Sequence, residues 1–241
     1  MTRLRRAALL GAAALCLAGC MPEPATVQGR DVATLYGYFM VAAAVVGLVV
    51  AGLISWSVIR YRAHGSQAAL PPQTRGHFWL EVTWWALPTL LTLGLIVGTS
   101  IVLGRVDASP PASSLKVEVT GFQWGWRFTY PDAGVTVVGT AADPQRISLP
   151  VDRPVTFILK SADVVHSFFV PHLLVKRDTV PGRVNELTVT FDEQGTYAGQ
   201  CGEFCGLLHA DMRFEIDAVS EPAFQTWLAS QATASPAEAT P

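Results

Sequence analysis

Charged residues are scarce in this sequence. Lys, Arg, Asp and Glu make up 15% of the 241 residues, whereas apolar residues make up 50%. Soluble domains usually carry about 25% charged residues, so this composition excludes an ordinary soluble protein and indicates membrane segments. The formal net charge is only −2, and we expect no nucleic-acid partner.

Cysteine is also rare, with four residues in the chain. No C-x-x-C-H motif occurs, which excludes a covalently attached c-type haem. Two of the cysteines, Cys16 and Cys20, lie at the N-terminus in a targeting segment. Cys201 and Cys205 are therefore the only cysteines left for chemistry in the rest of the chain.

The N-terminus has the pattern of an export signal. Arginines within residues 3–6 precede an apolar run at 7–18. The run ends in Leu-Ala-Gly-Cys20, which is similar to a bacterial lipoprotein cleavage site and implies removal of residues 1–19 and lipidation of Cys20. An ordinary signal peptide and an uncleaved anchor are the alternatives. In each case we expect residues 20–34 to lie outside the cytoplasm.

Two long stretches, residues 32–59 and 82–104, contain no charged residue. Each is long enough to cross about 30 Å of hydrocarbon as a helix. We therefore predict a two-helix transmembrane hairpin at 35–105, with spans at about 35–59 and 81–104.

The loop between these spans carries Arg60, Arg62 and Arg75 and no acidic residue. Cytoplasmic loops are enriched in Lys and Arg, so this loop is predicted to be cytoplasmic. The predicted location is the bacterial cell (inner) membrane, multi-pass, with everything after about Arg105 on the periplasmic side.

The exported part is acidic. From Arg105 onward, ten Lys and Arg face sixteen Asp and Glu, a net charge of −6 (10 − 16). An acidic surface can steer a basic partner to its docking site. Solubility alone is the other explanation, and the charge does not distinguish the two.

The exported part is also predicted to be rich in strands. Short β-type runs separated by Pro and Gly indicate a sandwich or small barrel at 106–220. The runs are 115–120, 147–149, 155–159, 186–191 and 214–219. Ser220 is expected to cap a C-terminal helix at 221–231, and residues 232–241 are expected to form a disordered tail.

Aromatic residues occupy every second position of one segment. They are Phe122, Trp124, Trp126, Phe128 and Tyr130. Because side chains alternate along a strand, we predict a single strand with all five rings on one face. Most of these rings would pack on the core, and one at the rim would serve as a docking anchor or electron acceptor.

The most informative pattern is a run of possible metal ligands. Cys201, Cys205, His209 and Met212 follow one another at spacings of four, four and three, and His166 lies upstream. Thiolate and thioether are soft donors that favour copper or zinc, and imidazole suits both metals. Because these ligands exceed the needs of one tetrahedral ion, they indicate two metals bridged by sulfur.

Three other interpretations of this run remain open. The spacing fits one face of an α-helix, although Gly202 and Gly206 disfavour a helix by about 1 kcal/mol each. Cys201 and Cys205 could form a disulfide in an exported protein. A structural zinc site is the third, but the two histidines are not spaced as a usual zinc-binding pair, and zinc does not need the methionine.

Taken together, residues 30–230 resemble subunit 2 of the haem–copper cytochrome c oxidases. The resemblance rests on Glu81-Val-Thr-Trp-Trp-Ala-Leu-Pro88, on Gln123-Trp124-x-Trp126, and on His166 with the 201–212 run. It implies an N-terminal two-helix transmembrane hairpin plus an all-β cupredoxin-like Greek-key sandwich. It also implies a binuclear copper centre, copper A.

The resemblance assigns a role to each ligand. It makes Cys201 and Cys205 the bridging thiolates, and it gives one copper to His166 and the other to His209. Two weak ligands complete the set, Met212 for one copper and the backbone carbonyl of Glu203 for the other. The Glu203 carboxylate would reach a magnesium ion at the interface with subunit 1.

The resemblance also implies two roles outside the copper ligands. Trp124 would receive the electron from cytochrome c. Phe122 and Gly125 replace the histidine and aromatic residue usual in the family, so the donor could be a different c-type cytochrome or a small copper protein. Glu81 matches a carboxylate near the entrance of a proton pathway in subunit 1, although a plain helix-end carboxylate is the alternative.

The function predicted is that of subunit 2 in a terminal cytochrome c oxidase. It would accept electrons at copper A and pass them to haem in subunit 1, where oxygen is reduced to water with proton translocation. Subunit 1, subunit 3 and the donor are the expected partners. The alternatives are a membrane-tethered copper chaperone or sensor and a quinol-oxidase-type subunit 2, which lacks the copper ligands present here. Nitrous oxide reductase shares the copper centre but no other feature.

Overall fold

The computed structural model of the chain describes residues 21–62 and 73–234. The predicted signal peptide and Cys20 lie outside the described residues. The chain divides into two units, one made of residues 31–105 and the other of the residues up to Arg30 together with those from Val106 onward. The proposed boundary of the exported domain remains a prediction.

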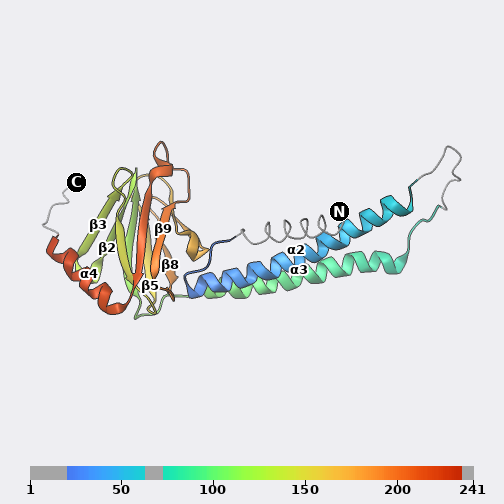
Figure 1. Cartoon of the computed structure of the whole chain (residues 1–241), viewed down its shortest axis with the longest axis horizontal. Coiled ribbons are helices and arrows are strands. Elements are labelled where there is room, and N and C mark those ends of the chain that lie inside the picture. Colours follow the sequence, from blue (N-terminus) through green and yellow to red (C-terminus); the bar gives the residue numbers. More distant parts are fainter. Residues whose placement is uncertain (1–20, 63–72, 235–241) are drawn as a thin grey trace, which may run out of the picture. The chain divides into compact units, whose positions relative to one another are not determined.

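The first unit is a pair of long helices. Helices α2 (Val27–Arg60) and α3 (Phe78–Val106) run side by side in opposite directions (Figure 1). Near their paired ends Asp31 and Arg105 form an ion pair of 3.2 Å. Both helices are long and apolar enough to cross a membrane, and both extend beyond the predicted spans of 35–59 and 81–104.

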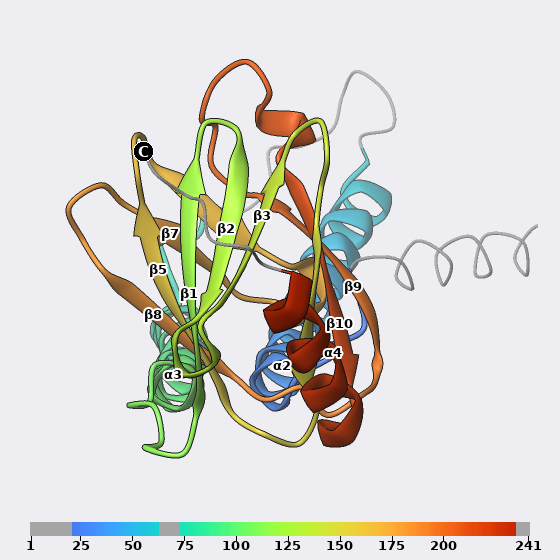
Figure 2. The same cartoon turned by 90° about the vertical axis from the view of Figure 1, so that its left-hand side faces the viewer.

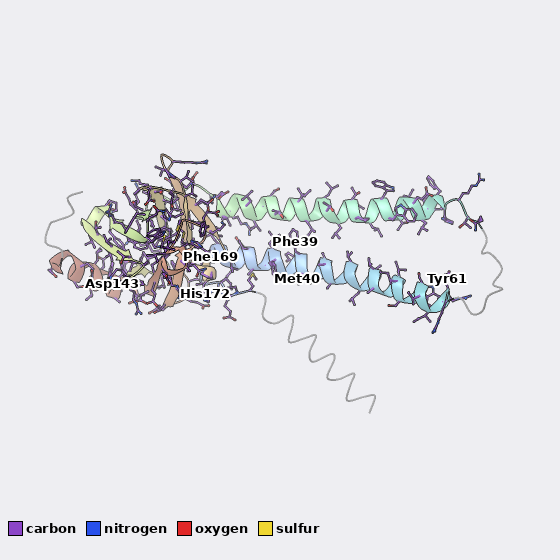
Figure 3. All side chains as sticks on the ribbon, turned by 90° about the horizontal axis from the view of Figure 1, so that it is seen from above. Phe39, Met40, Tyr61, Asp143, Phe169 and His172 are labelled. Carbon is purple, nitrogen blue, oxygen red and sulfur yellow. The ribbon has the colours of Figure 1, made fainter. Side chains whose placement is uncertain are left out.

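Apolar side chains cover the outside of these helices instead of being buried between them. Figure 3 shows them along both helices, with Phe39 on α2 and Tyr61 just after its end. Phe39 is 40% exposed and Tyr61 is 75% exposed. Because a water-soluble helix pair would bury its apolar residues, this surface suits a lipid environment.

The second unit is a sandwich of two five-stranded sheets, whose strands are seen lengthwise in Figure 2. The first sheet has the order β3 (Val135–Thr140), β2 (Gly125–Tyr130), β1 (Leu115–Phe122), β5 (Val155–Ser161), β8 (Asn185–Val189). The second has the order β4 (Arg146–Pro150), β10 (Arg213–Val219), β9 (Gly195–Cys201), β6 (His166–Phe169), β7 (Lys176–Thr179). Neighbours are antiparallel except the pairs β1–β5 and β10–β4. The prediction of a helix hairpin followed by an all-β sandwich is confirmed.

Aromatic rings fill the space between the sheets. Phe168 stacks on Phe214 with ring centroids 5.1 Å apart, and Trp126 meets both rings edge-on at 6.1 and 5.6 Å. All three side chains are at most 1% exposed. Such buried aromatic pairs add about 0.5–1.5 kcal/mol each beyond the burial of their area. These rings pack the first sheet, through Trp126, against the second sheet, which carries Phe168 and Phe214.

The five predicted strands all occur, but four other strands were missed. These are β3, β6, β7 and β9. β7 carries Lys176, Arg177 and Asp178, a charged composition that suits an edge strand and hides its strand character. In β9, Gly199 is required because a Cβ there would lie 2.2 Å from the Phe214 ring.

The prediction of one aromatic strand across residues 122–130 is wrong. Phe122 ends β1 and pairs with Gly125, the first residue of β2, so Gln123 and Trp124 form a two-residue hairpin turn. A Cβ at Gly125 would lie 2.2 Å from the carbonyl oxygen of Gly139 on β3, so only glycine fits there. The three later rings, at 126, 128 and 130, are buried on the core face.

The segment before α2 belongs to the sandwich. Ala25 N–H donates to the His172 carbonyl at 2.9 Å, and Asp192 N–H donates to the Ala25 carbonyl at 3.3 Å. Thr26 is fully buried, and Arg30 pairs with Asp192 at 2.6 Å. These contacts hold residues 25–30 against the sandwich.

The C-terminal helix α4 (Glu221–Ala234) packs against β4 and β3, an edge strand from each of the two sheets. Its Trp227 meets the buried Tyr130 ring at 5.5 Å. The helix begins at the predicted residue but runs beyond 231, because residues 232–234 continue the helical turn. The predicted disordered tail is therefore wrong for those three residues, and the rest of that tail lies outside the described residues.

Phe214→Ala is expected to lower the free energy of unfolding by about 3–5 kcal/mol, because it leaves a cavity among the stacked rings. The measurement is denaturant unfolding of the purified chain in detergent, followed by tryptophan fluorescence. Val138 lies on β3 and is 44% exposed. Val138→Ala is therefore the control and should change the free energy of unfolding by less than about 0.5 kcal/mol. Equal effects in the two variants would contradict the packing described.

Candidate metal centre

The ligand run is positioned by the ends of two neighbouring strands. Cys201 is the last residue of β9, and it stands opposite Phe168 of β6. The loop that follows is tied back on both sides, since Gly202 N–H donates to the Ser167 carbonyl at 2.9 Å and Cys201 N–H donates to the Met212 carbonyl at 3.0 Å. The loop therefore folds over the end of the sandwich.

The two thiols lie together but are not bonded. Cys201 Sγ and Cys205 Sγ are 3.8 Å apart, whereas a disulfide needs about 2.05 Å. Both residues are buried, at 4% and 5% exposure. Nor does the run form an α-helix, because it passes from β9 through a loop to the short 3-10 helix η3 (His209–Asp211). The helix and disulfide alternatives are not what this structure adopts.

Each imidazole lies beside a different sulfur. His166 Nδ1 is 4.0 Å from Cys201 Sγ, and His209 Nδ1 is 3.6 Å from Cys205 Sγ. The nitrogen of His166 and the two sulfurs all lie within 4.8 Å of one another, a group able to hold a metal ion. The two sulfurs are thus central and the two imidazoles flank them.

Two weaker donors also lie one beside each sulfur. Met212 Sδ lies 3.8 Å from Cys205 Sγ, and the Glu203 carbonyl oxygen lies 3.1 Å from Cys201 Sγ. Met212 is fully buried. All six donors expected from the sequence therefore surround one small volume.

A carboxylate orients the first histidine. Asp163 Oδ1 lies 2.8 Å from His166 Nε2, so Nδ1 is left facing the sulfur. Burial opposes protonation of His166, but its hydrogen bonds with Cys201 and Asp163 outweigh burial and raise its pKa. Burial likewise opposes ionisation of Asp163, but hydrogen bonds from His166 and backbone N–H groups outweigh it and lower the pKa.

The two thiols ionise very differently. Burial would raise the pKa of Cys201, but hydrogen bonding with His166 and with the backbone of Glu203 and Ser167 lowers it. Burial raises the pKa of Cys205, and the charge of the nearby Cys201 thiolate raises it further. The first thiolate is therefore formed readily, and the second forms only when another positive charge offsets the first.

The Glu203 carboxylate faces a lysine. Lys176 Nζ, on β7, lies 3.3 Å from Glu203 Oε2 and 3.8 Å from Asp178 Oδ1. The Glu203 side chain is 48% exposed and lies at the surface. The group is a carboxylate at a surface, as a hard cation would require, but it is already partly neutralised by an ammonium group.

The Gln123–Trp124 turn touches the ligand loop. Gln123 Nε2 and Trp124 Nε1 both donate to the Cys205 carbonyl oxygen, at 2.8 and 3.2 Å. The sequence interpretation found Trp124 but missed Gln123, Asp163 and Lys176 as neighbours of the site. For Asp163 a signal exists, since a carboxylate three residues before a candidate ligand histidine can accept its second ring N–H.

Glu81 lies elsewhere, in the first turn of α3, and its side chain is exposed. It belongs to the helical unit. A carboxylate there also stabilises the helix N-terminus by about 0.3–1 kcal/mol.

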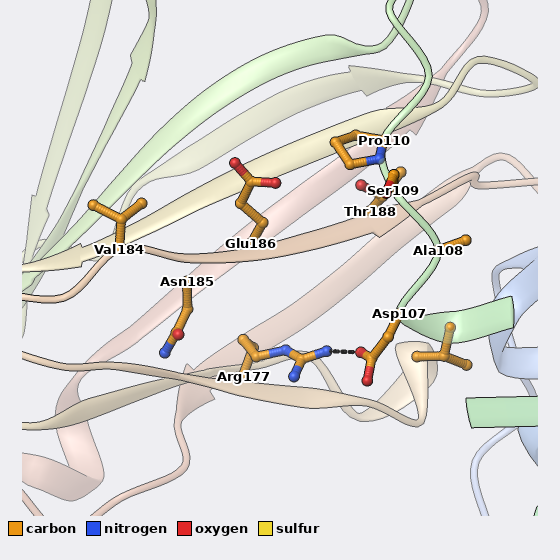
Figure 4. A pocket seen from close by; sticks show the side chains of 10 residues that line it. Asp107, Ala108, Ser109, Pro110, Arg177, Val184, Asn185, Glu186 and Thr188 are labelled. Carbon is orange, nitrogen blue, oxygen red and sulfur yellow. Dashed lines mark hydrogen bonds and ion pairs between the residues drawn. The ribbon is translucent and has the colours of Figure 1, made fainter. Parts of the chain in front are cut away.

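A polar pocket of about 280 Å³ lies away from the thiols (Figure 4). It is lined by residues 106–110 and by parts of β7 and β8, and Arg177 forms an ion pair with Asp107 inside it. Its lining contains no sulfur and no imidazole. It is therefore separate from the metal-ligand cluster.

In metal-free protein, one thiolate should appear as the pH rises through a value well below the ordinary thiol pKa of about 8.5. This order of ionisation follows because the pKa of Cys201 is lowered and the pKa of Cys205 is raised. The measurement is thiolate ultraviolet absorbance against pH. Cys201→Ser should abolish the early step, and two simultaneous ionisations at the ordinary pH would contradict it.

Comparison with known proteins identifies the family. Residues 136–219 match the family profile described as cytochrome C oxidase subunit II, periplasmic domain. A probable cytochrome c oxidase subunit 2 of Streptomyces avermitilis is 31% identical, over 86% of this chain and 77% of the relative. Its counterpart in Rickettsia bellii is 30% identical, over 86% and 82%.

A solved periplasmic domain of subunit II of cytochrome oxidase from Bradyrhizobium japonicum is also similar. It is 29% identical with a TM-score of 0.49, over 52% of this chain and 99% of that one. The helix pair and the periplasmic-domain match make the chain membrane-anchored. With relatives about 30% identical over most of both sequences, the protein belongs to the cytochrome c oxidase subunit 2 family, a component of an oxidoreductase.

Proposed function

We propose that this chain is the electron-accepting subunit of a terminal cytochrome c oxidase. It takes electrons from cytochrome c at a binuclear copper A centre and passes them to haem in subunit 1, where oxygen is reduced to water with proton translocation. The observation that carries the proposal is the pair of buried thiols 3.8 Å apart, each flanked by its own imidazole.

The donor set fits two copper ions. Cys201 and Cys205 would bridge them, with His166 on the first copper and His209 on the second. Two soft thiolates, two imidazoles and a thioether match the preference of copper. Met212 beside Cys205 and the Glu203 carbonyl beside Cys201 would complete the two sites.

When bound, the copper pair would supply a one-electron carrier whose shared charge keeps geometric change small. The chain contributes a rigid support, because Cys201 and His166 stand on paired strands over stacked aromatic rings. Burial of both thiols and of Met212 keeps water away from the ligands. His209 and the loop surface near it remain partly exposed, which leaves a side for a donor.

Trp124 is proposed to receive the electron from the donor. Its ring is partly exposed in the hairpin turn, and its Nε1–H bonds directly to the carbonyl of the ligand Cys205. This contact gives a short covalent and hydrogen-bonded route to the sulfur. The donor is cytochrome c, another c-type cytochrome or a small copper protein.

The Glu203 carboxylate is proposed to hold magnesium at the interface with subunit 1. Its partial exposure and its neighbours support an interface role. Magnesium would compete there with the Lys176 ammonium group, so binding requires that this side chain turn away or share the carboxylate.

The remaining roles concern assembly. Subunit 1 and subunit 3 are the proposed partners in the membrane, with the sandwich on the periplasmic side. Glu81 at the start of α3 is proposed to lie near the entrance of a proton pathway in subunit 1. Cys20 is proposed as the lipidation site after removal of residues 1–19.

Burial of the ligands argues against a copper chaperone or sensor. Such a protein exchanges its metal and needs donors that open to a partner. Here Cys201, Cys205 and Met212 are each at most 5% exposed and are held by the strands. A copper-less quinol oxidase subunit would have no use for this donor set.

The proposal predicts two copper ions per chain and an electron paramagnetic resonance spectrum split by two equivalent copper nuclei. The measurement uses the purified full-length chain in detergent after copper loading, with metal analysis of the same sample. Cys205→Ser is the matched control and should lose the shared spectrum. A single copper, or bound zinc in its place, refutes the proposal.

Trp124→Phe should slow reduction by the donor by at least about tenfold, or about 1.4 kcal/mol in activation free energy. The substitution keeps an aromatic ring but removes the hydrogen bond to Cys205. Rapid-mixing kinetics with reduced cytochrome c measure the effect, and copper content should not change. Phe122→Leu, at the end of β1 just before the turn, is the control and should keep the wild-type rate. Equal rates in wild type and Trp124→Phe would dismiss the route.

A further inference from the structure

Five residues, the two cysteines included, are connected in a closed ring of contacts that runs through side chains and backbone groups. Cys205 accepts a hydrogen bond from Gln123, Gln123 donates through its backbone to Asp163, and Asp163 contacts His166. His166 lies against Cys201, and Cys201 lies against Cys205. The ring thus joins the turn that carries Trp124 to a histidine of the ligand set.

Asp163 is the residue of this ring that links the turn to His166. Its Oδ2 accepts the Gln123 backbone N–H at 2.6 Å. Its Oδ1 accepts the Val164 N–H at 2.7 Å and lies 2.8 Å from His166 Nε2. Both oxygens are used, so this carboxylate is bound to the protein rather than displayed as a free surface charge, although its side chain is 32% exposed.

The His166 ring is fixed from three directions. Asp163 bonds its Nε2, and the Trp126 ring meets it edge-on at 6.2 Å. On a third side it lies against the backbone of Gly121, where a Cβ would be 3.0 Å from its Cδ2. Gly121 is itself tied to the Asp163 loop, because Ala162 N–H donates to its carbonyl at 3.0 Å.

We propose that Asp163 is a positioning residue that holds the Gln123–Trp124 turn and the His166 ligand in one hydrogen-bonded frame. It fixes the His166 ring with Nδ1 toward Cys201 and at the same time fixes the turn that contacts the Cys205 carbonyl. This role rests on the proposed copper function of the same residues. It assigns Asp163 to the geometry of the centre.

Asparagine at this position must break the frame. Asp163→Asn has nearly the same shape, but one of its two carboxylate oxygens becomes an NH2 group. Either Gln123 N–H, or Val164 N–H and His166 Nε2–H, then faces a donor in place of an acceptor. A buried donor left without an acceptor destabilises this arrangement, so the ring or the turn must move.

The test compares copper-loaded full-length chains in detergent. Asp163→Asn should still bind two coppers, but its resonance spectrum should show unequal copper couplings, and its reduction potential should rise because a carboxylate no longer supports the oxidised centre. Asp163→Glu keeps the charge and an acceptor, and should restore part of the wild-type spectrum.

Asp143→Asn is the matched control. Asp143 lies on the 140–145 loop, which also contacts the turn through Ala141 N–H to the Trp124 carbonyl at 2.8 Å, but it does not contact His166. This variant removes an equal charge and should leave the spectrum and potential unchanged. Gly121→Ala should push the His166 ring from the opposite side and disturb the spectrum with Asp163 intact.

The outcomes separate the two proposals. If the wild-type chain shows no shared copper pair, the proposed function fails. If the wild type shows it and Asp163→Asn has the same spectrum and potential, the positioning role alone is overturned. A change only in the salt dependence of donor reduction, equal in Asp163→Asn and Asp143→Asn, also overturns it, since that is the behaviour of a docking charge. Should Asp163→Asn not fold, Asp163→Ala takes its place, and a wild-type spectrum and potential in that variant overturn the positioning role.

Discussion

The pairing of β6 with β9 is the constraint on which the cluster of candidate metal ligands depends. The register sets Phe168 opposite Cys201, and because side chains alternate along a strand, His166 points to the same face two residues away. A shift of one residue would turn the histidine to the other face and leave the thiol alone. The buried Phe168 ring, stacked on Phe214, holds this register in place.

Around that pairing, three connections arrive from other parts of the fold. The β1–β2 turn reaches the Cys205 carbonyl, the loop after β5 supplies Asp163, and β7 brings Lys176 to the Glu203 carboxylate. None of the three bonds to a sulfur: they reach the Cys205 carbonyl, the His166 ring and the Glu203 carboxylate. The candidate ligands are thus held by segments that lie far apart in the sequence.

Much of the fold and the ligand set could be predicted from local patterns. The uncharged stretches indicated both long helices, and the soft donors at 201–212 indicated the site. The errors have physical causes: Gly125 is dictated by the close approach of the Gly139 carbonyl, and Gly199 by the Phe214 ring. Both are tertiary contacts, which no local pattern reveals. β7 was missed because an edge strand can be charged throughout.

The sequence by itself determined the chemistry available, because residue type fixes donor softness and charge whatever the fold. It also determined which stretches are apolar enough to lie in a membrane. Only the tertiary structure decided that the thiols remain unbonded at 3.8 Å, that each imidazole has its own sulfur, and that Asp163 bonds both the turn and the ligand histidine. The contacts of His166 with Cys201 and of Asp163 with Gln123 join residues 35 and 40 positions apart, where long-range packing and not local propensity sets the distance.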